Sequence, residues 1–181
     1  MSTSQLLDQN IESYVINGKN ASKTIIEDQG NNTLALIKET SLGGGCVLVV
    51  PGGKTIVKIR SKFMSSDMIM EDSEKKIIGK IKNQKGILIL QDKTKEPLLI
   101  GTWFTRKFPY CEITDKNQNL IASFSMTLTS NRKRRWFSQW YDKYTLHIHD
   151  LSFSRLILLG FFTYVHYELS KPNSMPLFFP G

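Results

Sequence analysis

The chain has 181 residues, a length that fits one domain with a sizeable hydrophobic core. Its 24 Lys and Arg exceed its 16 Asp and Glu, giving a net charge of +8, and residues 101–181 alone have a net charge of +5. This excess favours polyanionic partners, or else it serves only solubility. Cys46 and Cys111 stand far apart without a second pair, which excludes a disulfide framework or a recognisable zinc spacing, and we expect both to be buried.

Residues 1–20 form an N-terminal segment that we expect to be disordered in part. This segment contains Asp8 and Glu12 and no continuous apolar run, which is unlike a signal peptide or an N-terminal membrane anchor. We therefore expect a cytoplasmic protein that is peripheral wherever it meets a membrane.

Turn signals recur along residues 21–170, each between two stretches of strand-forming residues. In four places an Asp is followed six positions later by Leu or Ile: Asp28 and Leu34, Asp72 and Ile78, Asp92 and Leu98, Asp115 and Ile121. Because Asp starts a turn by bonding its own backbone, each copy predicts a β-hairpin. Pro51-Gly52-Gly53 predicts another hairpin, and residues 140–148 suggest a sixth.

Six hairpins make about twelve strands, and their regular spacing favours a closed antiparallel barrel. Some predicted strands have two unlike faces, as a wall with one buried face does: Thr55, Val57 and Ile59 face opposite to Ile56, Lys58 and Arg60. The strand predicted at residues 86–90 is apolar on both faces, which indicates that something covers its outer face as well. We therefore expect a mainly β fold with one helix.

The sharpest local feature is the segment 131–141, in which four consecutive cations precede several aromatic residues. Cations attract anionic lipid and tryptophan favours the headgroup boundary, so the segment suits a membrane surface. The same residues suit nucleic acid, and a third alternative is an exposed turn whose aromatic residues fill the core. The predicted binding residues are Arg132, Lys133, Arg134, Arg135, Trp136 and Trp140. Trp103, Arg106 and Lys107 extend this site if neighbouring strands bring the two segments together.

His147 and His149 lie two positions apart and would share one face of a strand. This spacing occurs in metal sites, but Asp150 is the one further ligand nearby, so we predict no metal and no cofactor. Gly43-Gly44-Gly45 lacks the lysine and the following helix of a phosphate-binding loop. No Ser-His-Asp order stands out either, and we expect the protein not to be an enzyme.

Residues 151–169 are largely apolar, but the span without a charged residue runs only from Leu156 to Tyr167, which is short for the roughly 20 apolar residues that a bilayer requires. We expect a helix over about residues 152–169, capped by Asp150 or Ser152 and buried inside the barrel. Its polar residues form one narrow seam that must find partners there. The seam comprises Ser152, Arg155, Thr163 and His166.

Gly160 lies in the middle of this helix, where we expect a strand backbone to approach closely. The tail at residues 171–181 combines prolines with apolar residues. We expect the tail to pack on the barrel without forming a helix.

Several phrases resemble the tubby C-terminal-like superfamily, and the similarity is greater to its LURP-one-related proteins and phospholipid scramblases than to tubby itself. These phrases are the repeated Ile-x-Asp turns, IIGKI at 77–81, YCEITD at 110–115, and Asp150 followed by RLILLGF at 155–161. The resemblance covers residues 30–170 and implies a twelve-stranded barrel closed around a hydrophobic C-terminal helix. It also implies a tendency to bind phospholipid. The acidic calcium-binding segment of scramblases has no counterpart here beyond Asp150.

From these features we expect a non-enzymatic, monomeric barrel that binds anionic phospholipid or phosphoinositide surfaces peripherally. One alternative is a scramblase-like membrane protein in which the terminal helix leaves the barrel. A second is a nucleic-acid-binding module, which we rank lower, and a third is a regulatory scaffold.

Overall fold

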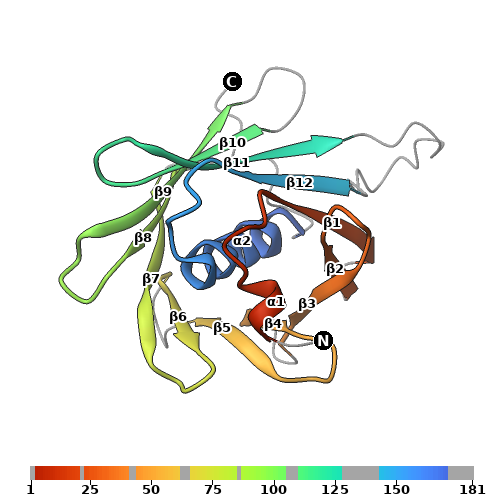
Figure 1. Cartoon of the computed structure of the whole chain (residues 1–181). Helices are drawn as coiled ribbons and strands as arrows, with labels where there is room; N and C mark the ends of the chain where they lie inside the picture. Colours follow the sequence, from red (N-terminus) through yellow and green to blue (C-terminus); the bar gives the residue numbers. More distant parts are fainter. Residues whose placement is uncertain are drawn as a thin grey trace, which may run out of the picture.

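The computed structural model describes residues 3–20, 23–40, 44–61, 66–84, 87–104, 110–127 and 143–170. Twelve antiparallel strands surround one long helix, which confirms the predicted barrel around a C-terminal helix (Figure 1). The first six strands are β1 Ser13–Asn20, β2 Lys23–Glu27, β3 Thr33–Glu39, β4 Gly45–Val49, β5 Thr55–Ser61 and β6 Met68–Asp72. The last six are β7 Ile77–Gln84, β8 Ile87–Gln91, β9 Pro97–Phe104, β10 Tyr110–Thr114, β11 Leu120–Thr127 and β12 Lys143–Ile148. The helices are α1 Thr3–Leu6 and α2 Arg155–Ser170.

The strands follow one another around the barrel in chain order, and β1 pairs with β12 to close it. The five clear turn signals each join a hairpin: β2–β3, β4–β5, β6–β7, β8–β9 and β10–β11. The arm of the sixth predicted hairpin is a strand that pairs with the preceding β11, but the predicted turn is misplaced, because Lys143 and Tyr144 already belong to β12. Residues 140–142 of that predicted turn lie outside the described residues. The pairing that completes the barrel therefore joins the first strand of the chain to the last.

The four Asp turns share one hydrogen-bond pattern. The Asp carboxylate accepts backbone N–H groups within the turn; Asp115 Oδ1, for example, lies 2.8 Å from Asn117 N and 2.9 Å from Asn119 N. The residue three positions after each Asp has a positive φ, a conformation that reverses the chain tightly. These residues are Asn31, Lys75, Lys95 and Gln118. Local chemistry thus fixes where these hairpins turn.

α2 begins at Arg155, three residues after the expected start. Its cap is Ser154, whose Oγ accepts the N–H of Ile157 at 3.5 Å. Asp150 instead accepts the backbone N–H and the hydroxyl of Ser152, at 2.9 and 2.6 Å. Both predicted caps are therefore engaged in a turn that precedes the helix, and Ser152 is not part of the helical seam.

α2 fills the inside of the barrel with apolar side chains. Leu158, Phe161, Phe162 and Val165 are fully buried among inward-facing strand residues. Cys46 and Cys111 are also buried in this core, as predicted. The barrel is consequently a packed core and not a channel.

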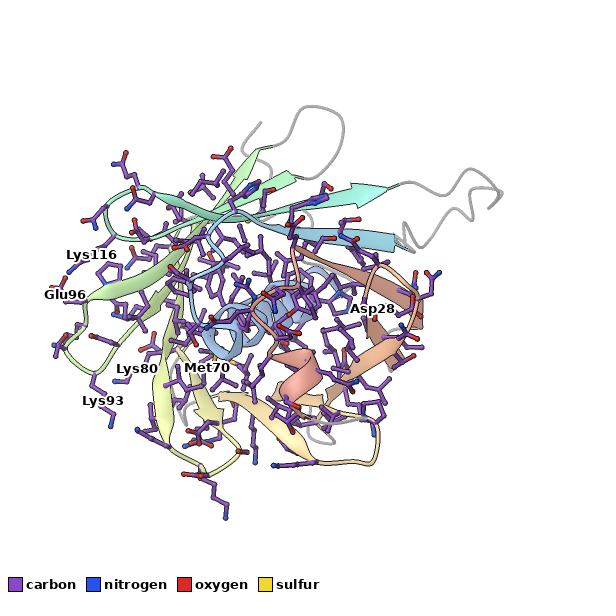
Figure 2. The ribbon with its side chains drawn as sticks, viewed as in Figure 1. Asp28, Met70, Lys80, Lys93, Glu96 and Lys116 are labelled. Atoms are coloured by element: carbon purple, nitrogen blue, oxygen red, sulfur yellow. The ribbon has the colours of Figure 1, made fainter. Side chains whose placement is uncertain are left out.

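Gly160 faces side chains and not the strand backbone that the sequence predicts. A Cβ at this position would come within 2.6 Å of the Met70 sulfur and 3.2 Å of Cγ1 of Val57. Met70 reaches the helix from β6 (Figure 2). Close approach to a strand backbone occurs at Gly79, where a Cβ would lie 2.4 Å from the Gln91 carbonyl oxygen.

The N-terminal segment belongs to the barrel, which corrects the predicted domain boundary after residue 20. β1 begins at Ser13, and α1 before it places Leu6 in the core. The Tyr14 hydroxyl donates to the Leu6 carbonyl at 2.8 Å, and burial raises the pKa of Tyr14 to about 12, so this donor keeps its proton. Arg155 Nη2 donates to the Gln9 carbonyl at 2.9 Å. Residues 3–12 therefore cover the barrel where α2 starts.

The barrel has two unlike ends. At the turn end, the five hairpin turns, α1 and residues 149–154 surround the start of α2. At the connector end, the chain passes between β1 and β2, β3 and β4, β5 and β6, β7 and β8, β9 and β10, and β11 and β12. The 16 residues of α2 span about 24 Å between the two ends.

Candidate functional site at the connector end

The two predicted basic segments connect neighbouring strands at the connector end. β9 ends at Phe104 opposite Tyr110, the first residue of β10. Tyr110 is also opposite Ser125 of β11, and Thr127 is opposite Lys143 at the start of β12. Both segments are therefore attached to one continuous part of the rim, from β9 to β12.

Of the predicted site residues, Trp103 has a described backbone, which lies in β9 opposite Cys111. The others lie outside the described residues: Arg106, Lys107, Arg132, Lys133, Arg134, Arg135, Trp136 and Trp140. For these residues, the structure locates the ends of the strands that precede and follow them.

Formal charge is divided unequally between the segments attached at the two ends. At the turn end, residues 1–12, 28–32, 50–54, 73–76, 92–96, 115–119 and 149–154 contain six Lys and Arg and eight Asp and Glu. At the connector end, residues 21–22, 40–44, 62–67, 85–86, 105–109, 128–142 and 171–181 contain nine Lys and Arg and two Asp and Glu. The net charges are therefore −2 and +7, and the strands and α2 supply the remaining +3.

The turn end offers little to an anion. Lys116 Nζ lies 3.9 Å from Glu96 Oε2, and both side chains come from neighbouring turns (Figure 2). A shallow cleft of about 280 Å³ between residues 10–13 and the β2–β3 turn presents the carboxyls of Glu12 and Asp28. The Asn32 amide holds the pKa of the Asp28 carboxyl below its ordinary value, so that carboxyl stays ionised. The segments attached at the connector end therefore carry the larger excess of positive charge.

The polar seam of α2 finds partners inside the barrel. Besides the contact of Arg155 with Gln9, the Thr163 hydroxyl donates to the Leu159 carbonyl at 2.7 Å. His166 Nε2 lies 2.8 Å from Thr24 Oγ1 in β2. The seam therefore ties α2 to the N-terminal segment at one end and to β2 near the other.

The two histidines lie at the end of β12, His147 within the strand and His149 just after it. His147 lies in β12 opposite Ser13 and Ser123, and His149 Nε2 lies 2.9 Å from Ser123 Oγ. Within the described part of the chain, no three His, Cys, Asp or Glu side chains come together as a metal site requires.

One further surface adjoins the rim, because β9 leads directly into residues 105–109. The outer faces of β7, β8 and β9 carry Lys80, Lys82 and the exposed Ile87. These residues are absent from the predicted site. In the sequence, the strand predicted at residues 86–90, which is apolar on both faces, indicates this surface. Only the topology shows which charged residues lie beside that strand.

Among the helices of the described residues, none has the length and apolar character that crossing a bilayer would take.

No protein-family model and no curated protein matches the chain. A solved structure with a similar fold is the X-ray structure of the Arabidopsis thaliana protein AT5G01750. The two superpose with a TM-score of 0.57 over 89% of this chain and 96% of the other, at 12% sequence identity. At this identity the similarity concerns the fold, and function has to be argued from the surface of this chain.

Proposed function

We propose that this protein is a non-enzymatic barrel that binds anionic phospholipid or phosphoinositide surfaces peripherally through its connector end. The observation that carries the proposal is the charge asymmetry, +7 on the segments attached at this end against −2 at the turn end. Residues 132–135 supply four of these cations, and Arg106 and Lys107 supply two. Trp136 and Trp140 add rings of the kind that settle at the headgroup boundary.

The two ends of the barrel are far enough apart for the difference in charge to set the orientation of the protein on a membrane. A Lys or Arg near an anionic bilayer contributes about 1 kcal/mol, and the attraction is screened over about 8 Å at physiological ionic strength. The ends of α2 are about 24 Å apart, so a charge at the turn end contributes almost nothing when the connector end faces the membrane. The barrel therefore binds in one orientation.

The proposal includes membership of the tubby C-terminal-like superfamily, near its LURP-one-related and scramblase-like branches. The twelve-stranded barrel around a C-terminal helix, which the resemblance implies, supports this assignment at the level of the fold. The inside of the barrel is filled by side chains such as Phe161 and Phe162, which favours a ligand site on the surface. A scramblase-like action would require α2 to leave the barrel and expose these rings to lipid.

Vesicle flotation tests the proposal. We expect the protein to float with vesicles that contain phosphatidylserine or phosphatidylinositol bisphosphate, and to remain in solution with pure phosphatidylcholine. Recovery should fall as salt is raised, because the attraction is screened. Equal recovery on neutral and anionic vesicles would sink the proposal, and salt-dependent binding to single-stranded RNA without flotation would favour the nucleic-acid alternative.

Two variants of equal net charge localise the binding. The first replaces Arg132, Lys133, Arg134 and Arg135 with Ala, and the second replaces four exposed lysines of the turn end, Lys54, Lys76, Lys93 and Lys116. We expect the first variant to bind anionic vesicles roughly a hundredfold to a thousandfold more weakly, because four charges of about 1 kcal/mol each are lost and each 1.4 kcal/mol is a factor of about ten. The second variant should bind like the wild type. An equal loss in both would mean that net charge matters and the connector end does not.

A further inference from the structure

The outer faces of β7, β8 and β9 form a surface of lysine and isoleucine. Along β8, Leu88 and Leu90 are fully buried, so Ile87 and Ile89, which alternate with them, face outward. Ile87 is 40% exposed. This isoleucine thus lies on the outside of the barrel beside the connector end.

The strand register places these residues side by side. Lys82 is opposite Ile89, which is opposite Ile100 on the other side. Ile87 lies one row nearer the connector end, opposite Gln84. We call the outward-facing set the Lys-Ile wall. It consists of Lys80, Lys82, Ile87, Ile89 and Ile100.

The Lys-Ile wall is free of negative charge. The sequences of β7, β8 and β9 contain Lys80 and Lys82 and no Asp or Glu. The neighbouring part of the barrel differs, because Arg60 of β5 forms an ion pair of 2.6 Å with Glu71 of β6. The wall therefore extends the positive connector end along the side of the barrel and adds apolar side chains to it.

We propose that the Lys-Ile wall lies against the anionic bilayer and that Ile87 enters the headgroup boundary, so that the barrel binds tilted onto β7–β9. This inference rests on the proposed function and adds the orientation. Lysine stems lie along apolar surface while their ammonium groups reach outward to phosphate, and an isoleucine gains by leaving water at the boundary. A bilayer fits this surface better than a protein partner does, because lysine is depleted in protein interfaces.

A fluorescent label at position 87 tests the contact directly. Ile87→Cys is labelled with a polarity-sensitive nitrobenzoxadiazole group; the native Cys46 and Cys111 are buried and stay unlabelled. The matched label is at Ser73→Cys, an exposed position in the β6–β7 turn at the turn end. On adding phosphatidylserine vesicles, we expect emission at position 87 to shift to the blue and brighten, with no change at position 73. An unchanged emission at position 87 under conditions where the labelled protein floats overturns the inference.

A pair of isoleucines provides the matched binding test. Ile87 is 40% exposed and Ile77, at the turn end of β7, is 39% exposed. We expect Ile87→Asn to weaken partitioning onto anionic vesicles by roughly threefold to tenfold and Ile77→Asn to leave it unchanged. Equal exposure makes the effect on folding similar, and the melting temperatures of both variants check this. Equal binding losses overturn the inference.

The outcomes separate the inference from the proposed function. If the wild type does not float on anionic vesicles, both are wrong. If the wild type floats, the 132–135 variant loses binding and the emission of the label at position 87 does not change, the proposed function stands and the tilted orientation is wrong. A blue shift that depends on protein concentration before any lipid is added would assign the wall to contact between copies of the chain, against the inference.

Discussion

His166 places an imidazole in the apolar interior of the barrel, where it is 5% exposed. Nε2 has the contact with Thr24, and the ring meets that of Tyr144 edge-on at 5.5 Å between centroids. Nδ1 is buried and has no hydrogen-bond partner among the described residues. Burial therefore lowers the pKa of His166 from 6.5 to about 4, and the ring is neutral at pH 7.

This shift predicts acid destabilisation. The unfolded chain takes up a proton as pH falls through 6.5, whereas the folded chain does so only near pH 4, so stability declines across this window. Between pH 7 and pH 5 we expect the free energy of unfolding to fall by about 2 kcal/mol. Urea unfolding at pH 7 and at pH 5 measures this change in the free energy of unfolding.

His166→Asn is the control for this prediction. Asn can still bond Thr24 but does not titrate, so the variant should be less stable at pH 7 and lose much less stability on acidification. The exposed His147 and His149 are retained in both proteins. If the wild type and the variant lose equal stability between pH 7 and pH 5, another group is responsible.

Arg155 shows how far a single residue can be interpreted from sequence. Its place in a polar seam predicts that a buried guanidinium needs partners. The partners are main-chain carbonyls of Gln9, Ile11, Asp150 and Phe153. Backbone carbonyls leave no pattern of residue types, so the sequence could not reveal that Arg155 holds the N-terminal segment in place.

At the scale of elements, the Asp turns explain why the hairpins were predictable. In each, the carboxylate and the positive φ three residues later are set by side chains within the turn itself. β1 and β12 have no such turn between them, because they are the first and last strands of the chain. Their pairing depends on closure of the whole barrel. The sequence predicted a closed barrel, but it did not predict that residues 13–20 form the strand that closes it.

Asp115 offers a test of the turn chemistry. Asp115→Ala removes the acceptor for two backbone N–H groups, whereas Asp115→Asn keeps an oxygen in place. We expect Ala to lower the melting temperature by a few degrees and Asn to lower it less. The Asn119 amide holds the pKa of the Asp115 carboxyl below its ordinary value, so the contribution of Asp115 is present above pH 3.8 and lost below it. Equal melting temperatures for Ala and wild type would contradict this role.

At the scale of the molecule, the division of charge between the two ends depends on topology. The sequence alone shows that Arg106 and Arg134 are basic. That both belong to segments attached at the same end follows from the order of the strands in the barrel. Lys54 and Lys116 belong to the opposite end for the same reason. Consecutive connections between the strands lie at opposite ends of the barrel. The basic residues are therefore seen to gather at one end only once the order of the strands is known.

The closure between β1 and β12 makes the whole barrel depend on its first twenty residues. A chain lacking residues 1–20 loses β1 and exposes the edges of β2 and β12, which can then pair with other chains. We expect this variant to aggregate in size-exclusion chromatography. A chain lacking residues 1–12 keeps β1 and loses the buried Leu6, so it should stay monomeric and unfold at lower urea concentration. A monomer of wild-type stability after removal of residues 1–20 would mean that β1 is dispensable and that the barrel closes without it.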